Sequence, residues 1–104
     1  YTHYKPKCDT MLFEADQVNL AVDAYKKAES QGKKAYLLCT NAVAKLSGVD
    51  NVLALGESGE EVASNLYDKL LEGEKIADVI IAVALPDEKG VNLGVMNRLR
   101  KSCG

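Results

Sequence analysis

The sequence contains little or no tryptophan, phenylalanine, proline and histidine. Its 104 residues contain no tryptophan, one phenylalanine, two prolines and one histidine. That histidine, His3, has no cysteine, aspartate or second histidine at ligand or triad spacing, which leaves a metal site or a Ser/His or Cys/His nucleophile without support. The three cysteines, Cys8, Cys39 and Cys103, form no C-x-x-C pair and are odd in number. Such usage is typical of a reducing compartment, and we expect a cytoplasmic location.

The sequence also lacks a charge excess and a long apolar run. Thirteen basic against fifteen acidic residues give a net charge of −2, so direct binding of nucleic acid by this chain alone is not expected. The longest apolar run, 79–85, is far shorter than the ~20 residues that span a bilayer, and no membrane anchor is expected. The chain opens with Tyr1 and has no charged-then-apolar leader, which favours a piece of a longer polypeptide.

What is present is enough apolar sequence for one domain, arranged in alternating patterns. Apolar composition is 47%, sufficient for a core without metals or disulfides. Short buried runs predict strands, and i, i+3, i+4 spacing predicts helices between them. The strands are expected at 10–13, 35–39, 52–55 and 79–84, and the helices at 18–28, 41–47, 58–73 and 92–101. This alternation predicts an α/β three-layer Rossmann-like or flavodoxin-like sandwich of about four mainly parallel strands, with helices on both faces. We expect residues 1–7 to end an interdomain linker and residues 8–104 to form the single domain.

Helix ends and buried helix faces follow from local chemistry. Asp16 is expected to cap the first helix and Asn41 the second, while Gly73 is expected to end the third. Ser58 and Glu61 have the spacing of a capping box. The helical stripes predict inward side chains at several positions, among them Tyr67 and Leu93.

Ligands of such sheets usually bind at the carboxyl ends of the strands. The turn after the first strand carries Glu14 and Asp16, as a phospho-receiver domain would, but that class needs an aspartate closing the third strand. Leu55 and Gly56 stand there instead. The pair is therefore interpreted as a helix cap and a solvated carboxylate.

Two further site classes fit poorly. The turn 56–59 lies where a helix N-terminus could hold phosphate, but it lacks the G-x-G-x-x-G spacing and the Walker lysine and is rich in glutamate, which favours a plain capping turn. A phosphocysteine enzyme would place its cysteine just after the first strand, whereas Cys8 precedes that strand and Cys39 ends the second. Core or edge thiols are the preferred interpretation.

The opening residues are aromatic, basic and stiffened by proline. They resemble the linker K-Y-R-H-Y-A-P-K that precedes the C-terminal domain of L-threonylcarbamoyladenylate synthase, in the YrdC-type threonylcarbamoyl-AMP synthase family. The residues that match are Tyr1, His3, Tyr4, Pro6 and Lys7, while Thr2 replaces arginine and Lys5 replaces alanine.

A second motif lies at the other end of the chain. Residues 90–99, GVNLGVMNRL, resemble the closing G-L-G-L-A-I-M-N-R-L of the same family, with Asn92 and Gly94 departing from it. The middle agrees loosely, since Ala63, Leu66 and Leu70 follow the family's A-x-x-L-F-x-x-L. Two separated motifs in the correct order make the resemblance fairly specific.

The resemblance implies a part of an enzyme. The family is a nucleotidyltransferase that condenses threonine, bicarbonate and ATP into threonylcarbamoyl-AMP, releasing pyrophosphate, for the modification of tRNA. Catalysis belongs to an upstream YrdC-like domain, which would be this domain's partner in the same polypeptide. The resemblance implies no cofactor in this chain, ATP and Mg²⁺ in the full-length enzyme, and no activity of the isolated domain.

By the same resemblance, this domain docks on the catalytic one and tethers the linker over its nucleotide cleft. The expected linker contacts are Tyr1, His3, Tyr4, Pro6 and Lys7, with no catalytic or metal-binding residue in the chain. Asn97 and Arg98 are candidates for an interdomain or phosphate contact. Two alternatives stay open: the linker residues only strap the chain onto the sheet, or the chain is a free-standing Rossmann-like binding or dimerisation module without catalysis.

Overall fold

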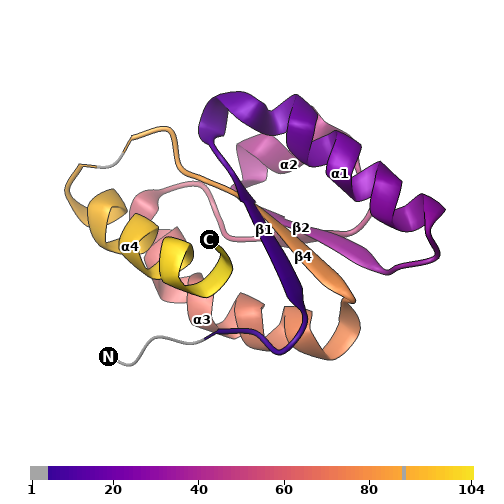
Figure 1. Ribbon diagram of the computed structural model, residues 1–104. Coiled ribbons are helices and arrows are strands. Elements are labelled where there is room, and N and C mark those ends of the chain that lie inside the picture. The colour runs from indigo at the N-terminus through magenta and orange to yellow at the C-terminus, as the bar shows by residue number, and fades with distance from the viewer. Residues whose placement is uncertain (1–4, 88) are drawn as a thin grey trace.

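The computed structural model describes residues 5–87 and 89–104 and contains a four-stranded parallel sheet. The strands are β1 (Asp9–Phe13), β2 (Ala35–Cys39), β3 (Val52–Ala54) and β4 (Val79–Val83), in the order β1-β4-β2-β3 (Figure 1). All three strand pairs are parallel. The predicted α/β architecture is confirmed, and β1 and β2 are separated by the last strand of the chain.

Strand β4 lies in the middle of the sheet because its sequence is apolar on both faces. Its residues VIIAV are all buried, and Ile80 is paired with Thr10 of β1 on one side and with Tyr36 of β2 on the other. A strand without polar alternation needs cover above and below it. Its place between two neighbours and two helical layers gives it that cover.

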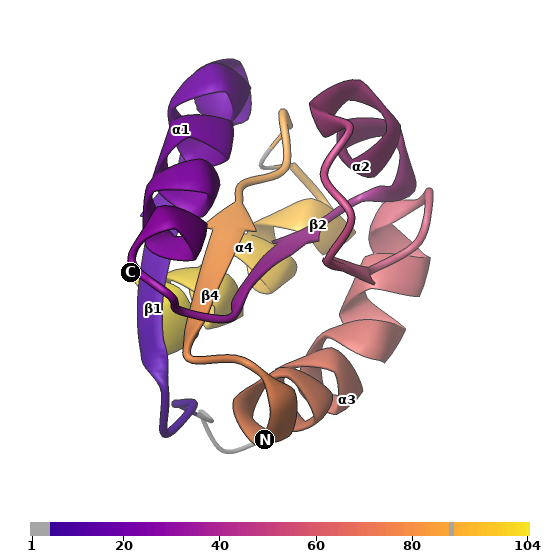
Figure 2. The same cartoon turned by 90° about the vertical axis from the view of Figure 1, so that its right-hand side faces the viewer.

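Helices cover both faces of the sheet. The 3₁₀ helix η1 (Ala15–Gln17) leads into α1 (Val18–Ser30), and α1 lies with α2 (Asn41–Ser47) on one face. On the other face lie α3 (Gly59–Ile76) and α4 (Val91–Cys103) (Figure 2). Alternate side chains of the strands feed two separate cores, with Leu37 and Ile81 toward α1 and Leu38 and Ile80 toward α3 and α4.

Two predicted caps are wrong by one or a few residues. Asp16 is exposed inside η1, and the cap before it is Glu14, whose N–H donates to Gln17 Oε1 at 2.9 Å. The tight 3₁₀ turn takes up the residues that separate strand and helix, so Asp16 lies inside this turn and the position before α1 falls on Gln17. Asn41 is the first helical residue of α2, and the preceding Thr40 caps it by accepting the Val43 N–H. The predicted capping box of Ser58 and Glu61 is confirmed.

Gly73 does not end α3, which continues to Ile76. It is buried where the helix lies closest to the sheet, and an added Cβ would be 2.7 Å from Leu53 Cδ1 and 2.8 Å from Ile80 Cδ1. The missing side chain therefore serves close packing of helix on sheet.

Two residues predicted to face the core are exposed, Leu93 by 49% and Tyr67 by 46%, and Leu46 of α2 is exposed by 76%. Other predicted positions of the same stripes do point inward, and Leu66 and Leu70 of α3 are buried as expected. Each apolar stripe is wider than the face that the sheet can cover, and burial selects only its centre. In the described part of the chain, no helix is long and apolar enough to cross a membrane.

Candidate functional site

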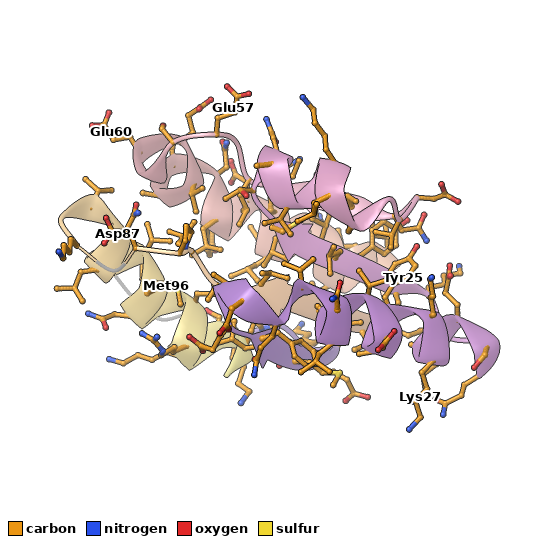
Figure 3. The ribbon with its side chains drawn as sticks, turned by 90° about the horizontal axis from the view of Figure 1, so that it is seen from above. Tyr25, Lys27, Glu57, Glu60, Asp87 and Met96 are labelled. Atoms are coloured by element: carbon orange, nitrogen blue, oxygen red, sulfur yellow. The ribbon has the colours of Figure 1, made fainter. Side chains whose placement is uncertain are left out.

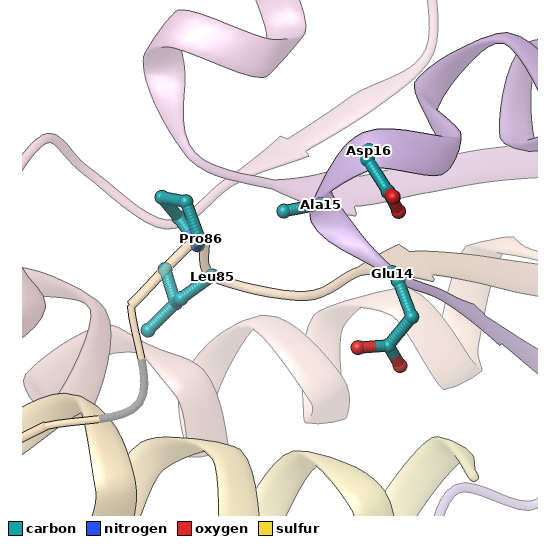
Figure 4. A pocket seen from close by; sticks show the side chains of 5 residues that line it. All are labelled: Glu14, Ala15, Asp16, Leu85 and Pro86. Atoms are coloured by element: carbon teal, nitrogen blue, oxygen red, sulfur yellow. The ribbon is translucent and has the colours of Figure 1, made fainter.

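The carboxyl ends of β1 and β4 border an open crevice of about 570 Å³. Its lining comes from the turn after β1 (Glu14, Ala15 and Asp16) and the segment after β4 (Leu85 and Pro86) (Figure 4). The chain leaves β1 toward α1 on one face and leaves β4 toward α4 on the other face. Such a divergence is the usual ligand position in open parallel sheets.

The chemistry of this crevice is that of a cap with two carboxylates. The Glu14 backbone N–H donates to the Gln17 side chain, and the Glu14 carboxylate lies 4.0 Å from the Arg100 guanidinium. Both side chains of this ion pair are largely exposed, so the pair is weak. Asp16 is exposed. Two carboxylates make the crevice unfavourable for a phosphate. The pair does consist of one capping residue and one solvated carboxylate, but Glu14 caps and Asp16 is solvated, the reverse of the expected roles.

The turn between β3 and α3 is closed by its own carboxylate. Glu61 Oε1 accepts the backbone N–H groups of Glu57 at 3.1 Å and Ser58 at 3.2 Å. These bonds hold the pKa of Glu61 below its usual range, and Gly56, at φ +115°, lets the turn fold over the Glu61 side chain. The neighbouring side chains of Glu57 and Glu60 point outward from the domain (Figure 3). The N–H groups of Glu57, Ser58 and Glu61 are already bonded within the turn, so the capping interpretation of residues 56–59 is confirmed.

The three cysteines are free thiols in apolar surroundings. Burial raises the pKa of Cys39 to about 12, and burial together with the neighbouring Cys8 raises the pKa of Cys103 to about 12. Burial is also the main cause that raises the pKa of Cys8, which is half-buried. Thiols held protonated in this way are poor nucleophiles, which fits the structural role expected for them.

The expected linker contacts are described only in part. Tyr1, His3 and Tyr4 lie outside the described residues. Pro6 is buried, and the Lys7 backbone N–H donates to Glu74 Oε1 of α3 at 3.1 Å. The residues just before β1 are thus fastened to the α3 side of the sheet.

Asn97 and Arg98 lie on α4, where Asn97 is exposed and Arg98 half-buried. The neighbouring Met96 was expected only to be buried. It is fully buried, and its sulfur also accepts the Leu85 N–H at 3.3 Å, which fixes the segment after β4. Neither this bond nor that of Glu74 follows from periodicity, because each joins residues that only the tertiary fold brings together.

The described residues do not fit the ATP and Mg²⁺ implied for the full-length enzyme. No group of three or more His, Cys, Asp or Glu side chains among residues 5–87 and 89–104 is arranged to hold a metal ion. The turn at the start of α3 holds Glu61 where a phosphate would bind, and the crevice after β1 is lined by carboxylates. In its described part, the chain is an α/β domain in which the turns after β1, β2 and β3 carry helix caps.

Comparison with known proteins identifies the family. All 104 residues match the family model described as "Threonylcarbamoyl-AMP synthase, C-terminal domain", and the chain belongs to this family. It is 34% identical to a threonylcarbamoyl-AMP synthase of Pyrococcus abyssi over 108 residues, which are all of this chain and 30% of that protein. The resemblance drawn from the two terminal motifs is confirmed.

Two solved structures are similar to the whole domain. The crystal structure of P. abyssi Sua5 complexed with L-threonine matches 98% of this chain with 30% of its own, at 32% identity and a TM-score of 0.79. The C-terminal Sua5 domain of Pyrococcus horikoshii matches over 94% of this chain and 95% of its own, at 30% identity and a TM-score of 0.70. The chain thus spans about a third of the full-length relative, and nearly all of a relative solved as a separate domain.

Proposed function

We propose that this chain is the accessory C-terminal domain of a threonylcarbamoyl-AMP synthase. In this proposal an upstream YrdC-like domain of the same polypeptide condenses threonine, bicarbonate and ATP and releases pyrophosphate. The product, threonylcarbamoyl-AMP, then serves the modification of tRNA in the cytoplasm. The family assignment, the 30% share of the relative's length and the relative's complex with L-threonine support this placement.

The domain's own task in this proposal is mechanical. It docks on the catalytic domain and holds the end of the linker, so that the linker closes over the nucleotide cleft and excludes water from it. One observation carries this role: Pro6 is buried and Lys7 is hydrogen-bonded to α3, so the chain is already fastened before the first strand begins.

ATP and Mg²⁺ belong to the upstream domain in this proposal. Tyr1 and Tyr4 would offer flat apolar faces to the nucleotide or the intermediate, and His3 and the Lys7 ammonium would donate toward phosphate. Asn97 and Arg98 would meet the partner domain or a phosphate at its edge. The isolated chain is expected to be inactive because it supplies none of the nucleotide-binding groups.

The test compares the full-length gene product with a truncated form that lacks residues 8–104. Pyrophosphate release from ATP with threonine and bicarbonate is measured for both, and for the 104-residue chain alone. We expect turnover by the full-length protein, a large loss on truncation, and none by the chain alone. Undiminished turnover without residues 8–104 would overturn the accessory role, and turnover by the chain alone would overturn its inactivity.

The alternative, a free-standing dimerisation module, predicts a different result. If no catalytic domain is encoded ahead of Tyr1 and the chain sediments as a stable dimer, this alternative replaces the proposal. A coding region for a nucleotide-binding domain ahead of Tyr1 would exclude it.

A further inference from the structure

The end of α3 is fixed so firmly that it can act as an anchor. Gly73 lets the helix lie directly on Leu53 and Ile80, and no Cβ would fit between them. The helix continues from there, and the Ala77 N–H donates to the Gly73 carbonyl at 2.8 Å. Glu74, the next residue along, is half-buried and therefore starts from a backbone that cannot shift without disturbing the core.

The segment 5–8 lies against this anchor and against the end of α4. The Lys7 N–H donates to Glu74 Oε1, and Cys8 packs on the core formed by α3 and α4. Lys5 lies near enough to the thiol of Cys103, at the end of α4, to affect its pKa. The chain before β1 accordingly runs along the C-terminal half of α3 (Figure 1). Because residues 5–8 contact both helices, the path of this segment along the domain is fixed.

Proline and the charged acceptor complement each other. Pro6 has a fixed φ and no N–H, so its burial leaves no donor unsatisfied and limits the freedom of the chain next to it. The first N–H after it, that of Lys7, meets a carboxylate, which is a stronger acceptor than a neutral oxygen. Asp9 then enters the sheet by donating its N–H to the Asp78 carbonyl at 3.3 Å.

We propose that Glu74 is a positioning residue: with the buried Pro6, it sets the point and direction in which the linker leaves this domain for the catalytic one. The inference rests on the proposed function and adds to it the residue through which the domain acts. Glu74 touches no substrate in this scheme. It acts through Lys7 and the linker residues ahead of it.

The experiment substitutes Glu74 in the full-length protein. Glu74→Ala removes the acceptor, whereas Glu74→Gln keeps an oxygen at the same place. Glu72→Ala is the matched control, because the exposed Glu72 lies on the same helix and pairs with Lys69 at 3.4 Å. Pro6→Gly tests the other half of the anchor without altering α3.

Two readouts separate positioning from simple stability. Hydrogen exchange of the Lys7 amide should become about tenfold faster in Glu74→Ala, the effect of losing one charge-assisted hydrogen bond. The increase should be smaller in Glu74→Gln, which keeps a neutral acceptor, and absent in Glu72→Ala. In Glu74→Ala and Pro6→Gly, the KM for ATP should rise several-fold with kcat little changed. In Glu74→Gln, the KM for ATP should stay close to the wild-type value. The melting temperature should stay within a few degrees.

The failures are distinguishable. Undiminished turnover on deletion of residues 8–104 overturns the proposed function. If that deletion abolishes turnover but Glu74→Ala changes neither Lys7 exchange nor KM, the anchor inference alone is overturned. Faster exchange with unchanged KM also overturns it, because the bond would then hold the chain without positioning it.

Discussion

The two helical layers differ in how completely they are built. In the α3–α4 layer, Gly59 and Gly73 allow close approach to neighbouring side chains, the Met96 sulfur satisfies a buried backbone N–H, and the segment before β1 is fastened. The α1–α2 layer has a groove of about 350 Å³ between its helices, and Leu46 at its rim is 76% exposed.

This difference separates a fixed side of the domain from a loosely covered one. The fixed side is also the side that receives the chain from upstream. Under the proposed function, a domain that holds a linker needs rigidity there and not on the opposite face. Comparable substitutions should therefore lower the free energy of unfolding more in the α3–α4 layer than in the α1–α2 layer.

The largest effect is expected for Gly73→Val. Its Cβ would lie less than 3 Å from Leu53 and Ile80, and overpacking of this kind costs about 3 kcal/mol. Denaturant unfolding measures the loss. Gly94→Val is the control, since nothing lies within 4 Å of a Cβ at position 94. The same exchange inside a helix changes helix propensity similarly at both positions. Equal losses at both positions would remove the evidence for close packing under α3.

Met96→Leu should have the second-largest effect. The change nearly conserves volume but leaves the buried Leu85 N–H without its sulfur acceptor, at a cost of about 2 kcal/mol. Leu99→Met, a similar exchange at another buried position of α4, should cost less. If thermal or chemical unfolding gives the two variants the same stability, the sulfur bond contributes nothing beyond packing.

Tyr25→Phe tests the corresponding bond in the α1–α2 layer. The Tyr25 hydroxyl accepts the Asn51 N–H at 3.1 Å, at a partly buried site where water can replace part of the bond. We expect a loss of about 1 kcal/mol, smaller than that of Met96→Leu. A larger loss than that of Met96→Leu, measured by the same unfolding titration, would reverse the ranking of the two layers.

Leu46→Ala should have the smallest effect, within about 0.5 kcal/mol, because an exposed side chain has little area to lose from the core. Sedimentation of the same variant accompanies the unfolding measurement. A loss above 1 kcal/mol would mean that Leu46 is covered in solution, and a simultaneous change in mass would identify a second copy as the cover.

The sequence predicted the site less well than the fold. Strand β2 was placed with its observed bounds, because Ala35 to Cys39 is a short apolar run between polar turns. The turn 56–59 was recognised as a cap from the spacing of Ser58 and Glu61. Glu74 gave no signal, since nothing local distinguishes it from Glu72 on the same helix. Its partner Lys7 lies 67 residues away, and only the packing of α3 brings them together.

By itself, the sequence determined the order of the elements, the parallel sheet with two helical layers, and the family, because these depend on hydrophobic periodicity and on two motifs read locally along the chain. Tertiary structure alone decided that β4 lies between β1 and β2, that Gly73 continues its helix, that Leu46, Tyr67 and Leu93 face outward, and that Glu74 holds the entering chain. The physical reason is that each of these depends on which surfaces compete for burial, a choice made between segments distant in sequence and not within any one of them.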